Sequence, residues 1–253
     1  MNSETTYTKR GRHGPMHTFN CDNCIGESIR RYGEWAEAEI SLLLSFVDAN
    51  SVVLDVGANI GTHTVALAKV AKEVFAFEPQ RRVFQVLCAN IVANQLPNVI
   101  AVNAAVGGSD GVAFLTNLSH DVPANNLGMA KIEGEGEGVP VALTAIDSGG
   151  IARCDLIKAD IEGYEIYALH GAERTIAAHR PVIYLEHHIN KGAVETWLRQ
   201  REYRLFYHEA PAFNPDNYAG STDNFHGDYV ETNLLAWPQE KALARTINEA
   251  WEI

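Results

Sequence analysis

The sequence is poor in basic residues. Its 253 residues include 20 Lys and Arg against 32 Asp and Glu, which gives a formal net charge of −12. A nucleic acid backbone is bound by clustered Lys and Arg, and the short pairs at 30–31 and 81–82 do not form such a cluster. We therefore predict that the protein has no nucleic acid partner.

Long apolar stretches are also missing. No segment approaches the ~18 apolar residues of a membrane span, and the polar N-terminus lacks the apolar core of a signal peptide. We therefore expect no membrane span and a cytoplasmic location.

Cysteine is scarce, with four residues in the chain. Cys21 and Cys24 form a CxxC pair, and together with His13 and His17 they can supply four zinc ligands. A single CxxC at this spacing is a weak signal, so incidental thiols are the favoured interpretation and zinc stays the alternative.

One apolar stretch is prominent. The β-branched run at 52–56 is typical of a buried parallel strand and ends in a turn that contains Gly57 and Gly61. The following residues predict a helix over 62–71, and a second strand at 74–77 ends on Glu78. This acidic residue lies close to the ~20 positions expected between the loop of a nucleoside-binding βαβ unit and its ribose-binding carboxylate.

The turn after the first strand limits the kinds of ligand that the site can bind. A dinucleotide loop reads GxGxxG, but Asp55 occupies the first glycine position, so a carboxylate is expected where a diphosphate would bind. A carboxylate suits a ligand with an ammonium group there, such as S-adenosylmethionine. Gly57 would let the ligand approach the backbone, Gly61 would let the helix pack on the strand, and Glu78 would accept hydrogen bonds from both ribose hydroxyls.

The rest of the chain alternates strands and helices, which predicts a doubly wound α/β fold with a mostly parallel seven-stranded sheet. Segments 111–118 and 139–146 read as an inserted hairpin, paired with itself or with the sheet edge. The loop 119–138 between them is either solvated or a lid, with Asp121, Asn125 and Asn126 as polar contacts. Further strands are expected at 99–106, 155–160, 181–186, 203–207 and 233–237, and further helices at 81–94, 164–178 and 194–201.

The two ends of the chain are expected to differ from this core. Residues 1–19 predict a mobile arm, or a segment ordered only by a partner or substrate. Residues 26–50 predict an irregular helical region, and the N-terminal region could mediate a homodimer. Within it, residues 32–35 predict a helix-to-helix turn, with a wall of the cofactor cleft as the alternative. We thus divide the chain into an N-terminal arm and helical extension (1–50), a cofactor-binding domain (51–240) and a terminal helix packed on that domain (241–253, helical over 242–251).

Polar residues gather where the predicted strands end, which is where open parallel sheets bind ligands. Each of these residues taken singly can be explained as a helix cap. As a set they form an acidic rim with two imidazoles, and the one cation in these segments is Lys158. Asn103 to Ala105, at the end of the third strand, are candidates for contact with adenine. The other rim residues are Asp55, Asn59, Glu78, Asp160, Glu162, Glu186, His187 and His188.

Five motifs together resemble the FkbM family of S-adenosylmethionine-dependent methyltransferases. They lie at 53–61, 77–79, 157–165, 170–173 and 180–186. The resemblance implies a class I methyltransferase fold and O-methylation of a sugar, glycan or polyketide-type hydroxyl. It also implies that Asp160 faces the transferred methyl group. The residues it implies for the cofactor are Asp55, Gly57, Ala58, Asn59, Gly61 and Glu78.

An alcohol is a poor nucleophile, so methyl transfer to it needs a base or a metal. The favoured hypothesis takes His187, or less favourably His188, as the general base, with Asp160 or Glu162 orienting it or the substrate. The alternative is Mg²⁺ bound by Asp160, Glu186 and His187. Two other classes of function stay open: an NAD-dependent oxidoreductase and a non-catalytic nucleoside-binding protein. The acceptor itself is not identified by the sequence.

Overall fold

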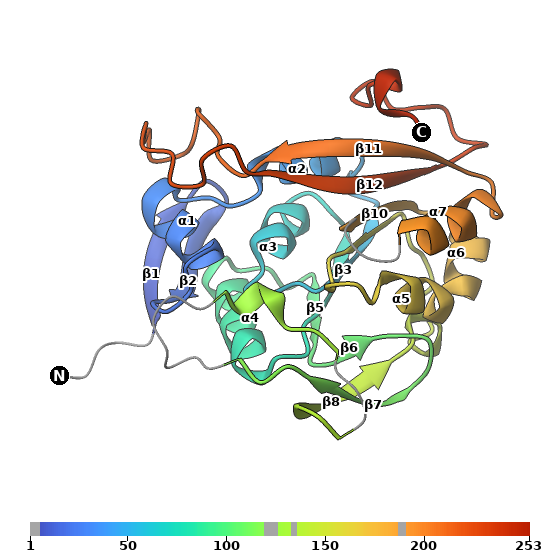
Figure 1. The fold of residues 1–253 in the computed structure, drawn as a ribbon, viewed down its shortest axis with the longest axis horizontal. Helices are drawn as coiled ribbons and strands as arrows, with labels where there is room; N and C mark the ends of the chain where they lie inside the picture. The colour runs from blue at the N-terminus through green and yellow to red at the C-terminus, as the bar shows by residue number, and fades with distance from the viewer. Residues whose placement is uncertain (1–5, 119–125, 133–135, 187–190) are drawn as a thin grey trace.

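The structure is a computed structural model that describes residues 6–118, 126–132, 136–186 and 191–253. At its centre is a seven-stranded sheet of order β11-β12-β10-β9-β3-β4-β5 (Figure 1). Five neighbouring strands are parallel, whereas β12 runs antiparallel to both β10 and β11. This confirms the predicted fold class. The strands are β3 (Val52–Val56), β4 (Glu73–Phe77), β5 (Val99–Val102), β9 (Leu156–Ala159), β10 (Val182–Glu186), β11 (Tyr203–Pro211) and β12 (Val230–Pro238).

Helices cover both faces of this sheet. One apolar core joins the sheet to α2 (Glu37–Leu44), α3 (Thr62–Ala68) and α4 (Arg81–Ala93). A second core, on the opposite face, joins it to α5 (Glu165–Gly171), α6 (Glu173–His179) and α7 (Lys191–Arg199) (Figure 1). Every residue of β3 is buried between the two cores, as its continuous apolar run predicts.

The helix predicted over 164–178 is two helices, α5 and α6, with a break at Ala172. Gly171 is the last residue of the first helix, and it must be a glycine because a Cβ there would lie 1.9 Å from the carbonyl oxygen of Gly107. The second begins where Asp147 accepts hydrogen bonds from the backbone N–H groups of Arg174 and Thr175, each at 2.8 Å. A long-range cap of this kind leaves no periodic signal in the helix itself.

The strand predicted over 99–106 is also divided. Its first part is β5, and its second part, β6 (Ala105–Val106), leaves the central sheet. It pairs with β8 (Val139–Thr144), which pairs in turn with β7 (Gly111–Leu115), so the insertion forms a three-stranded sheet of order β6-β8-β7. Asn103 lies at the division, where its Nδ2 donates hydrogen bonds to the carbonyl oxygens of Glu78 and Pro79.

The prediction of a mobile N-terminal arm is wrong for the described residues. β1 (Thr6–Gly11) and β2 (Gly14–Phe19) form an antiparallel hairpin. The hairpin lies on α4, where the fully buried Asn90 accepts a hydrogen bond from the backbone N–H of His17 at 2.6 Å and donates one to its carbonyl oxygen at 3.0 Å. Two polar bonds to one buried side chain fix the register of a segment whose own sequence is polar.

The helical region after the hairpin comprises α1 (Ile25–Tyr32) and α2. Gly33 ends α1 in the left-handed conformation, at φ 71°, which confirms the predicted helix-to-helix turn. No helix in the described part of the chain has the length and apolar character needed to cross a membrane.

The helix predicted over 242–251 is wrong. This segment is irregular and ends in a 3₁₀ turn at Glu249–Trp251. The last residues are held in extended form against β11, where Ile253 donates its N–H to the carbonyl oxygen of Leu205 and Glu252 forms an ion pair with Arg204. Because the backbone of the tail pairs with a strand, it is not free to form helical hydrogen bonds. The division of the chain at residues 50 and 240 stays a prediction.

Candidate active site

A cavity of about 600 Å³ opens at the carboxyl ends of the parallel strands. Its wall takes residues from the ends of β3, β4, β9 and β10, from the start of β6 and from the start of β12. This is the place where an open α/β sheet binds its ligand. The rim residues Asn59, Glu78, Asp160, Glu162 and Glu186 all lie on this wall, so the structure brings together five of the predicted polar positions.

The turn after β3 is fixed by close packing. Gly57 has a φ of 75°, and a Cβ at this position would lie 1.9 Å from the carbonyl oxygen of Asp160. The glycine is therefore required by the neighbouring strand β9, in addition to any ligand. Gly61 meets a different neighbour from the one predicted, because a Cβ there would lie 2.6 Å from Cδ1 of Leu87 on α4 and not against β3. It is absent from the described wall of the cavity, so its role toward a cofactor stays a prediction.

The expected position of Asp55 is wrong. Its side chain is fully buried and is absent from the described wall of the cavity. Oδ2 accepts a hydrogen bond from the Thr64 hydroxyl at 2.6 Å, and Oδ1 lies 3.5 Å from Nζ of Lys158. The reason is the pairing of β3 with β9, which sets Asp55 opposite Lys158. The carboxylate thus supports a lysine beneath the site and does not reach a bound ammonium group.

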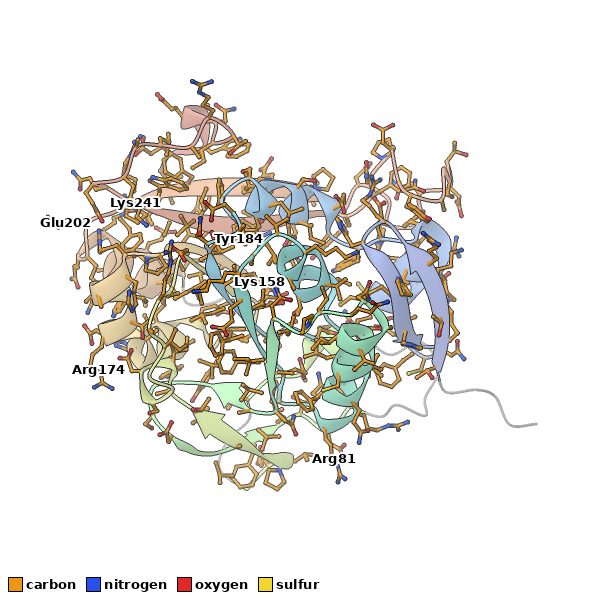
Figure 2. All side chains as sticks on the ribbon, turned by 180° about the vertical axis from the view of Figure 1, so that it is seen from behind. Arg81, Lys158, Arg174, Tyr184, Glu202 and Lys241 are labelled. Atoms are coloured by element: carbon orange, nitrogen blue, oxygen red, sulfur yellow. The ribbon has the colours of Figure 1, made fainter. Side chains whose placement is uncertain are left out.

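Lys158 contacts both the Asp160 carboxylate and the backbone of the turn after β3. Its Nζ lies 3.6 Å from Oδ2 of Asp160 and donates a hydrogen bond to the Gly57 carbonyl oxygen at 3.3 Å. Burial disfavours the charged ammonium, but the carboxylates of Asp160 and Asp55 outweigh it and raise the pKa of Lys158 above its usual value. Lys158 is therefore a permanent cation inside the molecule, whereas the labelled Arg81, Arg174 and Lys241 lie at the periphery (Figure 2).

Glu78 lies at the end of β4 and is 3% exposed. Its two carboxyl oxygens accept hydrogen bonds from the backbone N–H groups of Asn59 at 3.0 Å and Gln80 at 2.7 Å. Burial nevertheless raises the pKa of Glu78 to about 7. Each oxygen keeps a further lone pair, so the carboxylate can accept two more hydrogen bonds from a ligand.

An apolar patch adjoins Glu78 on the cavity wall. It is formed by Phe77, Ala104, Ala105 and Val106. Ala105 therefore lies where the sequence analysis expects the base of a nucleoside. Asn103 does not, because its side chain is turned to the backbone of Glu78 and Pro79 and is absent from the described wall.

The opposite part of the wall is acidic. Asp160 and Glu162 follow β9, Glu186 is the last residue of β10, and Glu231 lies on β12. Burial and the neighbouring carboxylates of Asp160 and Glu162 raise the pKa of Glu186 to about 10, and Glu186 shares a hydrogen bond with Asp160. Burial and Asp160 likewise raise the pKa of Glu162. A buried carboxyl group whose pKa is raised by neighbouring carboxylates is typical of a site that handles charge or protons.

Several proposed groups fall outside the described residues. These are His187 and His188, the candidate bases, and Asp121 and Asn125 of the candidate lid, so their roles stay predictions. Asn126, from the same loop, does line the cavity. Among the residues that the structure describes, no group of three or more His, Cys, Asp and Glu side chains is arranged to hold a metal ion, either at the Mg²⁺ candidates or at the CxxC pair.

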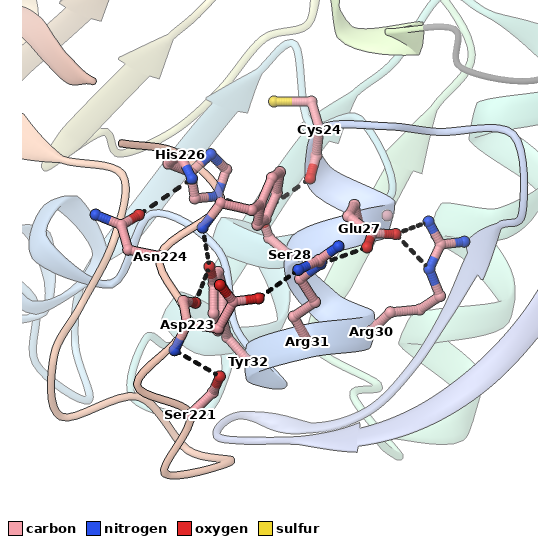
Figure 3. A network of polar contacts seen from close by, with 12 residues as sticks. Cys24, Glu27, Ser28, Arg30, Arg31, Tyr32, Ser221, Asp223, Asn224 and His226 are labelled. Atoms are coloured by element: carbon pink, nitrogen blue, oxygen red, sulfur yellow. Dashed lines mark hydrogen bonds and ion pairs between the residues drawn. The ribbon is translucent and has the colours of Figure 1, made fainter. Parts of the chain in front are cut away.

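The wall also has an aromatic part, formed by Trp35, which was the alternative prediction for residues 32–35, and by Phe225, His226 and Tyr229, which were not singled out as site residues. A polar network holds it on α1 (Figure 3). The Tyr32 hydroxyl donates to the Asp223 carbonyl oxygen and accepts from the Phe225 N–H. Both predictions for residues 32–35 therefore apply to Trp35, which follows the turn between two helices and also lines the cavity.

Glu39 and His63 were missed as well. Both are at least nine-tenths buried and line the cavity, with His63 Nε2 3.4 Å from a carboxyl oxygen of Glu39. His63 Nε2 has no hydrogen-bond partner among the described residues. Residue type alone did not identify this pair because its two members come from separate helices, α2 and α3.

The fold and the cavity at its strand ends define an α/β methyltransferase-type protein. The family model of the methyltransferase FkbM domain matches residues 55–205, so the chain belongs to the FkbM methyltransferase family. The resemblance drawn from the sequence motifs is thereby confirmed.

Individual relatives agree with this assignment. The hexuronic acid methyltransferase AglP of Haloferax volcanii is 31% identical over 137 residues, which is 52% of this chain and 54% of AglP. The structure of methyltransferase FkbM from Methylobacillus flagellatus is similar, with a TM-score of 0.52 and 19% identity over 75% of this chain and 44% of that one. The tRNA m1G37 methyltransferase of M. jannaschii, at 13% identity, has a TM-score of 0.50 over 94% of this chain and 58% of its own. The chain thus spans about half the length of these relatives, and the two solved structures support the fold alone.

Proposed function

We propose that the protein is an S-adenosylmethionine-dependent methyltransferase that methylates a hydroxyl group of a sugar-containing acceptor. The observation that carries this proposal is the buried Glu78 carboxylate on the cavity wall, held by two backbone N–H groups beside an apolar patch. A carboxylate with two free lone pairs suits a ribose diol, and the patch suits an adenine ring. The sugar acceptor is supported by the likeness to the hexuronic acid methyltransferase.

The cavity residues fit the remaining parts of the cofactor. Because Asp55 is buried below the wall, we assign the ammonium group of the methionine moiety to Glu39 or Asp160, both of which line the cavity. His63 lines the same cavity, and its Nε2, which lies 3.4 Å from Glu39 without a hydrogen bond, can bond the methionine carboxylate. When bound, S-adenosylmethionine supplies a methyl carbon on a positively charged sulfur, which leaves as a neutral thioether.

The chain's own residues then have two tasks, to align the acceptor oxygen and to remove its proton. Asp160 lies at the end of β9, between the Glu78 side and the acidic side of the wall, and can accept a hydrogen bond from the reacting hydroxyl. The proton leaves as the oxygen–carbon bond forms. His187 is proposed as its acceptor, with Glu162 as the orienting group.

Because the Asp55 carboxylate is buried and absent from the described wall, it does not oppose a diphosphate in the cavity, and a dinucleotide has to be tested as a ligand. Calorimetry with S-adenosylhomocysteine and with NADH separates the two ligands. We expect S-adenosylhomocysteine to bind the protein, to bind Glu78→Gln more weakly, and to bind the control Glu209→Gln unchanged, because Glu209 is exposed on β11 and absent from the described cavity wall. Binding of NADH in its place would contradict the proposal. A cytoplasmic location and a homodimer through the N-terminal region also stay proposals.

A further inference from the structure

The aromatic part of the cavity wall lies apart from the nucleoside part. Glu78 follows β4, on one side of β3, whereas Phe225, His226 and Tyr229 belong to the segment between β11 and β12, the last strands on the other side. If the proposed function holds, the nucleoside of the cofactor occupies the first region, and the aromatic part is left for the acceptor.

Ser28 holds the imidazole of His226 in place. Its Oγ lies 2.8 Å from Nε2 of His226 and 2.9 Å from the carbonyl oxygen of Cys24, one helical turn earlier in the chain. Figure 3 shows these residues in the network that joins α1 to the segment before β12. A carbonyl oxygen only accepts, so the single proton of the Ser28 hydroxyl is donated to Cys24. Both contacts are hydrogen bonds only if Nε2 of His226 carries a proton and donates it to Ser28.

The other ring nitrogen of His226 then has a lone pair. Burial and the positive charge of Arg31 on α1 lower the pKa of His226, so the imidazole is neutral at pH 7 and its single proton is the one on Nε2. Arg31 itself forms ion pairs with Glu27 and Asp223. In the described part of the chain no residue forms a hydrogen bond with Nδ1 of His226, and the residue lines the cavity. Nδ1 is therefore a hydrogen-bond acceptor that is left for a ligand.

Aromatic rings lie beside His226. The ring centroids of Trp35 and His226 are 5.4 Å apart, and Tyr229, on the same wall, is 50% exposed. Phe225 is less available to a ligand, since the Arg31 guanidinium lies 4.9 Å from its ring centroid. A sugar ring has hydroxyl groups at its edge and C–H faces that pack on aromatic rings. A hydrogen-bond acceptor beside partly exposed aromatic rings fits this chemistry.

We propose that His226 binds the methyl acceptor, with Nδ1 accepting a hydrogen bond from a hydroxyl group of its sugar ring, and that Ser28 is the positioning residue for the imidazole. The assignment rests on the proposed function, because it takes the acceptor to be a sugar. The contact holds the acceptor and leaves the removal of the reacting proton to His187. Ser28 is 1% exposed and is absent from the described cavity wall, so its effect on a ligand passes through His226.

NMR of protein with ¹⁵N-labelled histidine locates the ring proton, because protonated and unprotonated ring nitrogens differ strongly in ¹⁵N chemical shift. His226→Phe keeps an aromatic ring and identifies the His226 signals by their loss. At pH 7 we expect the Nε2–H form in the wild type and in the control Ser41→Ala, whose serine lies on α2 outside the described wall, and a mixture of both neutral forms in Ser28→Ala. The Nδ1–H form or an imidazolium in the wild type, or an unchanged Nε2–H form in Ser28→Ala, would overturn the proposal.

A titration of the protein saturated with S-adenosylhomocysteine then connects this nitrogen to the acceptor. The probes are methyl β-glucoside and methyl β-glucuronide. We expect at least one of them to shift the Nδ1 signal, and to bind His226→Phe about tenfold and Ser28→Ala about threefold more weakly than the wild type. An Nδ1 signal that neither glycoside shifts, or equal affinity for the wild type and His226→Phe, would overturn the proposal. Binding of S-adenosylhomocysteine is measured first, so its absence would instead contradict the proposed function.

Discussion

Lys158 is the residue whose loss should affect the protein most. It is 3% exposed and is the counter-ion of Asp55, which is 0% exposed. In Lys158→Met the Asp55 carboxylate would be left buried with one hydrogen bond, from Thr64, as its remaining support. Removing one partner of a buried ion pair costs about 3–5 kcal/mol of unfolding free energy, and we expect a loss in that range.

The cost should come from the uncompensated charge and not from lost packing, because Met has nearly the volume of Lys. The double variant Asp55→Asn/Lys158→Met should therefore recover most of the lost stability.

Urea unfolding of the wild type, the two single variants and the double variant measures all of these quantities. Lys241→Met is a suitable control, since Lys241 is exposed at the periphery (Figure 2). A Lys158→Met protein within about 1 kcal/mol of the wild type, or a double variant less stable than Lys158→Met alone, would refute the role assigned to the pair.

Three other perturbations have defined outcomes. Glu78 must be ionised to accept hydrogen bonds from both ribose hydroxyls, and burial raises its pKa to about 7. The affinity for S-adenosylhomocysteine, measured by calorimetry, should therefore fall about tenfold from pH 8 to pH 6. An affinity that does not change with pH would argue against this contact. Asn90→Ala removes the hydrogen-bond partner of the backbone of His17 and of Ile60. It should lower the free energy of unfolding by about 3 kcal/mol in urea and make the hairpin sensitive to protease. Asn94→Ala should lower the free energy of unfolding by less. Asp147→Ala removes the cap of α6 and should cost about 1–2 kcal/mol, with unchanged ligand binding as the sign that the effect stays local.

The order of strands and helices was predictable because each element carries its own pattern. The continuous apolar run of β3 and the spacing from its turn to Glu78 locate the nucleoside region before any coordinates are known. The element boundaries that were predicted wrongly depend on residues that are distant in the chain. Asp147 starts α6, Asn90 anchors the hairpin, and β11 holds the C-terminal residues in extended form.

The site was predictable in composition but not in orientation. Strand ends place Glu78, Asp160, Glu162 and Glu186 on one wall, as the sequence indicates. The direction of the Asp55 side chain depends on which strand lies beside β3. The neighbour is β9, which sets Lys158 opposite Asp55, and this pairing could not be predicted from the sequence. The aromatic wall depends in the same way on the docking of a late loop on an early helix (Figure 3).

A crystal structure with S-adenosylhomocysteine tests the central claim most directly. We predict a nucleoside whose ribose hydroxyls lie within hydrogen-bonding distance of the Glu78 carboxylate, with the adenine against Ala104 to Val106 and the sulfur turned toward Asp160. A ligand bound elsewhere, or a Glu78 carboxylate that makes no contact with the ribose, would contradict it.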